Sequence, residues 1–154
     1  MNRQYFNTIS FVFLIASISC IGQTSQSSTQ KKTLISVQQS YIEGNVVDQP
    51  QFDSLMKRDL ERYFSKTFGQ VSVKWEFLRK GPTQTGVAYP KYYLWIKIYY
   101  GDELLDEGAV RIAAIEKTGF DITDFVNIKD IRQKSKDIYM IFPKPVCEKI
   151  LSYL

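Results

Sequence analysis

Between residues 50 and 68 the apolar side chains recur at three- and four-residue spacing, which predicts one long amphipathic helix with charged residues on its other side. The apolar positions are Phe52, Leu55, Met56, Leu60, Tyr63, Phe64 and Phe68. Asp48 is placed to accept hydrogen bonds from the first free amides, and Pro50 suits the first turn. Gly69 stands where a left-handed C-terminal cap is expected. This helix should be the main one.

After Gly69 the apolar period becomes two, which is typical of a half-buried strand. Residues 71, 73, 75 and 77 are apolar and alternate with Ser72, Lys74 and Glu76. A turn-rich loop follows over 81–86, and then residues 92–100 (YYLWIKIYY) have the aromatic and β-branched composition that favours a pleated sheet. We therefore expect 92–100 to be the central strand.

Two tight turns predict that the chain continues as an antiparallel meander. Gly101-Asp102 is a two-residue hairpin turn, because glycine in the first position accepts a positive φ. Residues 104–116 return as a strand, 117–119 reverse the chain, and 120–126 form a further strand. A short helix should begin at Asp124 or Asn127, and 146–154 should form a terminal helix with Pro145 at its start.

The hairpin turn also fixes an expected register. It places Tyr99 opposite Leu104, Ile98 opposite Leu105 and Lys97 opposite Asp106. Continued without a break, this register would put Glu107 on the core face beside Ile96. We therefore expect a β-bulge at Gly108 that turns Val110 and Ile112 inward with Leu94, Ile96 and Ile98.

The opposite face of the central strand is the candidate binding surface. Its residues are Tyr93, Trp95, Lys97 and Tyr99, joined across the hairpin by Leu104 and Arg111. This face is too aromatic for plain solvent. Either the C-terminal tail covers it through Ile150, Leu151, Tyr153 and Leu154, or an outside partner does, for which tyrosine, tryptophan and arginine are the usual anchors. In both cases Trp95 should lie at the centre of the contact.

The N-terminal segment predicts export. No charge occurs between Arg3 and Lys31, and residues 9–21 are almost wholly apolar, a stretch too short for a membrane-spanning helix. A signal peptide over 1–22 would be cleaved after Gly22. The alternative is cleavage before Cys20, which would then carry lipid and anchor the protein to the envelope, although Ser17 departs from the usual lipobox.

The rest of the chain divides into a polar leader and one domain. Residues 23–33 are expected to be flexible, because 23–30 (QTSQSSTQ) have no apolar side chain. Residues 31–43 fit either a first strand or an ordered lead-in. The remaining chain, 34–154, is the right size for one domain, and the 44% apolar and 14% aromatic composition supports a core. Without Cys20, Cys147 has no partner for an intrachain disulfide and is expected to be a buried, inert thiol.

Charge and missing residue types narrow the chemistry. The formal net charge of +4 comes from interspersed acids and bases, as on a solvated surface rather than a nucleic-acid site. The chain has no histidine, which removes histidine-dependent triads and imidazole zinc sites. One mature cysteine cannot supply a thiolate cluster, and no phosphate loop occurs, so neither a metal nor a cofactor is expected. The acidic hairpin residues Asp102, Glu103, Asp106 and Glu107 are interpreted as solvated, because Asp106 and Glu107 should point to opposite faces.

The predicted fold class is α+β: one long helix on a four-stranded antiparallel meander sheet, with a short C-terminal helical tail. Over residues 50–126 this order resembles the cystatin-like and nuclear-transport-factor-like cone folds, in which a curved sheet wraps a helix. The QxVxG hairpin of cystatins is absent. We expect an exported, non-enzymatic domain that binds a protein, a peptide or a small apolar ligand with its aromatic sheet face or cone mouth. The alternative is a small lyase, isomerase or hydrolase that uses Asp121, Asp124 and tyrosines in the cone.

Overall fold

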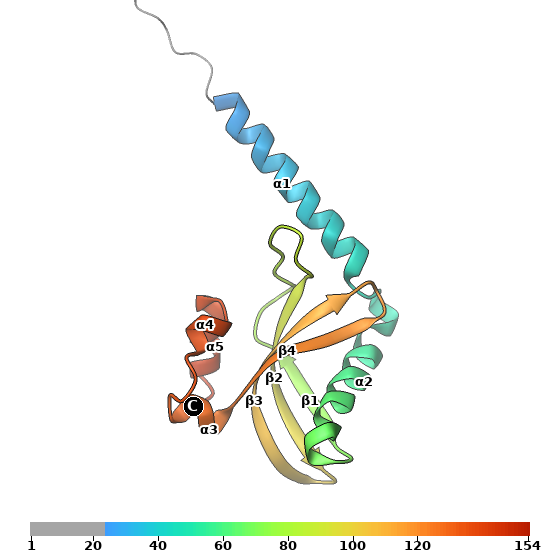
Figure 1. Cartoon of the computed structure of the whole chain (residues 1–154), viewed down its shortest axis with the longest axis vertical. Helices are drawn as coiled ribbons and strands as arrows, with labels where there is room; N and C mark the ends of the chain where they lie inside the picture. Colours follow the sequence, from blue (N-terminus) through green and yellow to red (C-terminus); the bar gives the residue numbers. More distant parts are fainter. Residues whose placement is uncertain (1–23) are drawn as a thin grey trace, which may run out of the picture.

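The computed structural model describes residues 24–154, which form two N-terminal helices, a four-stranded sheet and three short C-terminal helices (Figure 1). The elements are α1 (Thr24–Asn45), α2 (Gln49–Phe68), β1 (Ser72–Phe77), β2 (Lys91–Tyr100), β3 (Glu103–Ile115), β4 (Gly119–Asn127), α3 (Ile128–Arg132), α4 (Ile138–Ile141) and α5 (Lys144–Leu151). The strands follow one another in the order β1-β2-β3-β4, all antiparallel. The predicted α+β meander is confirmed. None of the helices in this part of the chain combines the length and the apolar content needed to cross a membrane.

Helix α2 buries four of the seven predicted apolar positions against one face of the sheet, while Tyr63 is exposed. Phe52, Met56, Leu60 and Phe64 are buried there, together with the inward side chains of β2 and β3. Gly69 closes the helix at φ 77°, with its N–H donating to the Ser65 carbonyl at 3.1 Å. Asp48 is the N-cap residue, as predicted, but the predicted hydrogen bond of its side chain to the first amides is wrong, since its carboxylate lies 3.6 Å from the Lys117 ammonium instead.

The β2–β3 hairpin turns at Gly101 as predicted, with φ 59° at that glycine. Tyr99 pairs with Leu104, but the predicted pairs of Ile98 with Leu105 and Lys97 with Asp106 are wrong. Leu105 is the extra residue of the bulge, so Ile98 faces Asp106 and Lys97 faces Glu107. The bulge has the expected effect on side-chain direction: Val110 and Ile112 point into the core, and Glu107 does not.

Gly108 is therefore not the bulge, and the β2–β3 ladder runs through it unbroken. Its role is close approach. A Cβ there would collide with the Val126 carbonyl oxygen and the Cα of Asn127, at the end of β4. The sequence cannot reveal this constraint, because it depends on where the next strand crosses.

Helix α1 occupies residues 24–45, so the expected first strand over 31–43 is wrong, whereas the alternative of an ordered lead-in fits the structure. Residues 24–33, expected to form a polar leader, are part of the same helix. The apolar positions 34, 35, 37, 41 and 42 alternate over a short window but equally occupy one side of a helix, and neither proline nor glycine interrupts residues 24–43. Its C-terminal end is fixed to the β3–β4 turn, where the Asn45 backbone carbonyl accepts from the Lys117 N–H at 2.9 Å. From there α1 extends away from the sheet (Figure 1).

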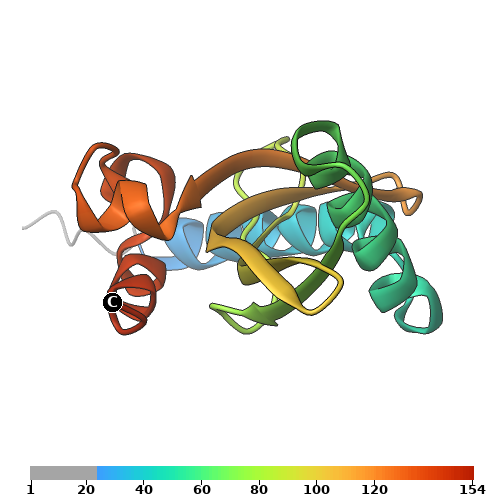
Figure 2. The same cartoon turned by 90° about the horizontal axis from the view of Figure 1, so that it is seen from below.

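The three short helices follow β4. Asn127 caps α3 by accepting from the Asp130 N–H at 2.7 Å, which confirms the second of the two predicted helix starts. Helix α5 begins at Lys144, close to the predicted start, with Pro145 in its first turn. Viewed from below, these helices lie at one end of the molecule, apart from α2 (Figure 2).

Candidate functional site

The aromatic face of β2 is covered by the chain's own C-terminal helices. Trp95 is 1% exposed and Tyr93 4% exposed. The Trp95 and Tyr153 rings stack with centroids 4.6 Å apart and planes 5° from parallel. Around them a second apolar core has formed, composed of Leu78, Tyr93, Trp95, Ala109, Val126, Ile131, Ile138, Phe142, Val146, Cys147 and Ile150. Of the two coverings considered from the sequence, the structure has the intramolecular one.

The tail makes this contact with a partly different set of residues from the one expected. Ile150 and Tyr153 contribute, whereas Leu151 and Leu154 are 43% and 47% exposed and point elsewhere. Cys147 is buried in the same core, and burial raises the pKa of its thiol. A protonated, buried thiol is a poor nucleophile, in agreement with the inert role expected for it.

The six residues expected to form one binding surface are divided by this covering, and Leu104 among them is 45% exposed. Tyr93 and Trp95 are in the second core, and the Tyr93 hydroxyl is 2.7 Å from Thr83 Oγ1. Lys97 and Tyr99 remain on the uncovered half of the face. There Lys97 lies 3.9 Å from the Glu107 carboxylate, and the Lys74 ammonium sits 5.0 Å from the centroid of the Tyr99 ring.

Arg111, another of the six, joins three elements. Its Nε donates to Asp124 Oδ2 at 2.7 Å and its Nη1 donates to the Ile141 carbonyl at 2.8 Å, so it links β3 to β4 and α4. With Tyr93 it also lines a cleft of about 210 Å³. Asp124, a candidate for the alternative enzymatic function, is thus committed to an ion pair.

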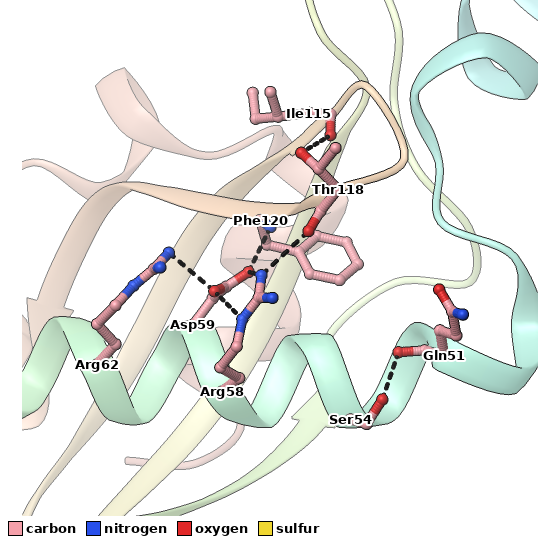
Figure 3. Close-up of polar contacts among 8 residues, drawn as sticks. All are labelled: Gln51, Ser54, Arg58, Asp59, Arg62, Ile115, Thr118 and Phe120. Carbon is pink, nitrogen blue, oxygen red and sulfur yellow. Dashed lines mark hydrogen bonds and ion pairs between the residues drawn. The ribbon is translucent and has the colours of Figure 1, made fainter.

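Asp59 on α2 is the buried charged residue of the described chain, at 1% exposure. Its carboxylate accepts from Arg58 Nε at 2.8 Å, from Arg62 Nη2 at 2.8 Å and from the Phe120 N–H at 2.7 Å (Figure 3). Arg58 reaches on to the Thr118 carbonyl at 3.0 Å. Both carboxylate oxygens of Asp59 thus accept hydrogen bonds, so this cluster links α2 to β4 and leaves no free acid or base for catalysis.

The space between α2 and the sheet is filled by apolar side chains. Met56, Leu60, Leu94 and Ile96 there have no exposed surface. Asp121, the other candidate acid, is exposed beside the Asp59 cluster instead of lying in an apolar cavity. Within residues 24–154, no group of acidic or thiol side chains is arranged to hold a metal ion. The arrangement therefore gives no support to the enzymatic alternative.

The second candidate site is a groove that the C-terminal helices form on their outer side, with a volume of about 530 Å³. We call it the C-terminal groove. Its apolar lining is Ile131, Ile138, Tyr139, Leu151 and Leu154, and its cationic lining is Arg132, Lys134 and Lys136. Leu151, Leu154 and Tyr139 are exposed, so the lining is open to a ligand.

The charges of the C-terminal groove are not neutralised by the described part of the chain. Lys136 lies 3.4 Å from the Asp130 carboxylate, but Arg132 and Lys134 form no ion pair with residues 24–154. The lining also contains one acid, Asp137, which caps α4 by accepting from the Tyr139 N–H at 2.9 Å and is outnumbered by the three cations. The groove thus combines an apolar floor with an excess of positive charge.

Sequence reasoning missed the C-terminal groove, although a signal was present. Residues 129–136 carry four cations and one acid, and the apolar residues 128, 131, 138 and 141 lie within or beside this segment. A local excess of positive charge beside apolar residues is a signal for a site that binds an anionic ligand.

Comparison with known proteins finds no matching family model, no matching curated protein and no matching solved structure. The likeness to cone folds stays a prediction, and function must be argued from the sites themselves.

Proposed function

We propose that the protein is an exported, non-enzymatic binding domain whose ligand site is the C-terminal groove. The observation that carries this proposal is the pairing of an apolar floor with two cations, Arg132 and Lys134, that have no ion-pair partner in the described chain. Sites for small ligands are concave, mainly apolar and furnished with a few polar groups that fix orientation. The groove volume of about 530 Å³ falls within the range of roughly 300–1,000 Å³ that such sites span.

The lining defines the ligand class: a small molecule with an apolar body and one negatively charged end. The side chains of Leu151, Leu154 and Ile138 would exclude water from the apolar body, and this burial would supply most of the binding free energy. A carboxylate or phosphate would meet Arg132 and Lys134 at the edge, where a charged hydrogen bond is stronger than a neutral one. A fatty acid has this chemistry.

Export is the second part of the proposal and rests on residues 1–22. Their apolar stretch and lack of charge support a signal peptide, and they lie outside the described residues. The same holds for Cys20, so envelope anchoring by lipid remains the alternative to a released protein.

Isothermal titration of the purified protein with dodecanoate, and with the uncharged dodecanol, tests the binding site. We expect dodecanoate to bind, dodecanol to bind more weakly, and the double change Arg132→Glu and Lys134→Glu to weaken dodecanoate binding by about tenfold or more. Lys144→Glu is the matched control, since Lys144 is an exposed cation at the start of α5 outside the groove. Equal loss in both variants, or no heat of binding with dodecanoate, would refute the groove as an anionic-ligand site.

A further inference from the structure

Strand β1 forms one edge of the sheet, and its backbone groups divide between two sides. The Leu78 N–H donates to the Tyr93 carbonyl at 2.9 Å, so the even-numbered positions of this segment face β2. The Val73 N–H instead donates to Glu61 Oε1 on α2 at 3.3 Å, which places the odd-numbered positions on the free edge. The backbone groups of Trp75 and Phe77 therefore face away from the sheet, where a further strand could pair with them.

The side chains of β1 are complementary to a second copy of the same strand. If two copies run antiparallel with Trp75 at the two-fold axis, Lys74 of each copy lies opposite Glu76 of the other. Trp75 then faces Trp75, and Val73 faces Phe77. Lys74 and Glu76 are exposed and form no ion pair within residues 24–154, and Phe77 is 43% exposed. An isologous contact of this kind repeats each favourable pair twice.

The neighbouring registers fail on the backbone or on the charges. If one β1 strand shifted by one residue along the other, odd-numbered positions would pair with even-numbered ones. The N–H and carbonyl groups of the even-numbered positions already face β2 and could not pair. A shift of two residues would place Lys74 opposite Lys74 or Glu76 opposite Glu76, and like charges directly opposite are destabilising.

We propose that two copies of this chain associate through antiparallel pairing of their β1 strands, which would join the two sheets into one. The surface is on a different element from the C-terminal groove, so it is independent of the proposed function.

In the proposed dimer, Glu61 would compete with the partner strand for one backbone donor of β1. It forms an ion pair with Lys57 on α2 and accepts from the Val73 N–H, a donor that the second copy's Phe77 carbonyl would otherwise take. Glu61 thus competes with the partner strand. Its replacement by alanine should release the Val73 N–H and strengthen the association.

Sedimentation equilibrium over a concentration series tests the proposal. We expect a monomer–dimer equilibrium, weakened about tenfold or more by Lys74→Glu or by Glu76→Lys, because each single change places like charges opposite each other twice. The double variant Lys74→Glu and Glu76→Lys restores opposite charges and should restore the dimer, while Glu61→Ala should tighten it. Lys80→Glu, in the loop after β1, is the control for general charge effects.

Three results would overturn this pairing. One is a protein that stays monomeric up to millimolar concentration, in both the wild-type and Glu61→Ala forms. Another is a dimer that ignores the single charge reversals. The third is a double variant that folds, by its thermal unfolding transition, and yet fails to recover association.

Discussion

Trp95 and Tyr153 stack against each other, and the buried Trp95 indole Nε1 has no hydrogen-bond partner in the described chain. A buried polar group without a partner is costly, so the apolar contact and ring stacking must outweigh that cost. Burial, and after it the nearby Glu76 carboxylate, raises the pKa of Tyr153 to about 12. The hydroxyl is therefore held in its neutral form.

The raised pKa of Tyr153 predicts a loss of stability at alkaline pH. The folded state holds this proton more tightly than the unfolded state, whose ordinary tyrosine pKa is 10.0, so the contribution is complete below pH 10 and is lost as pH rises toward about 12. Tyr153→Phe removes the titrating group but keeps the ring. Urea unfolding across this range should show a shallower decline for the variant than for the wild type. An identical decline in the two proteins would contradict the assignment.

At the scale of elements, β3 pairs with β2 on one side and with β4 on the other, and each pairing places a different constraint on its sequence. Its bulge at Leu105 sets which side chains meet β2, while Gly108 permits the close approach of β4. Gly108→Ala should destabilise the protein by about 1–3 kcal/mol, because the added methyl group meets backbone atoms that cannot rotate away. Chemical denaturation measures this change.

Gly44→Ala is the control for the glycine substitution, since a Cβ at position 44 has open space around it. It should leave the stability of the sheet nearly unchanged. A Gly108→Ala variant as stable as Gly44→Ala would mean that β3 and β4 are farther apart than described.

The period of the apolar residues predicted the helices and strands that bury one face. It was least informative for features that depend on contacts between segments distant in the sequence. The spacing of Phe52, Met56 and Leu60 was sufficient for α2, as was alternation for β2. The apolar positions of α1 fit both periods, and its partner contacts at Asn45 are remote in sequence. The position of Glu107 required a bulge, but the alternation of side chains did not show that it lies at Leu105 rather than at Gly108. The C-terminal groove depends on how three short helices meet, which no single period encodes.

At the scale of the whole molecule, one sheet separates two apolar cores. Alternate residues of β2 serve each, with Leu94 and Ile96 under α2 and Tyr93 and Trp95 under the C-terminal helices. The tail thus closes the face that the sequence had suggested for a partner. The same helices line the C-terminal groove, which is the site we propose for ligand binding.

The stability of Trp95→Ala tests this covering most directly. If the C-terminal helices pack on Trp95, removal of the indole should cost about 3–5 kcal/mol in the free energy of unfolding. Tyr99→Ala is the matched control, because Tyr99 lies on the same strand and face beyond the tail, and its loss should cost less than about 1 kcal/mol. A Trp95→Ala variant that unfolds with the same free energy as Tyr99→Ala would show that the tail does not cover this face, and would contradict the account.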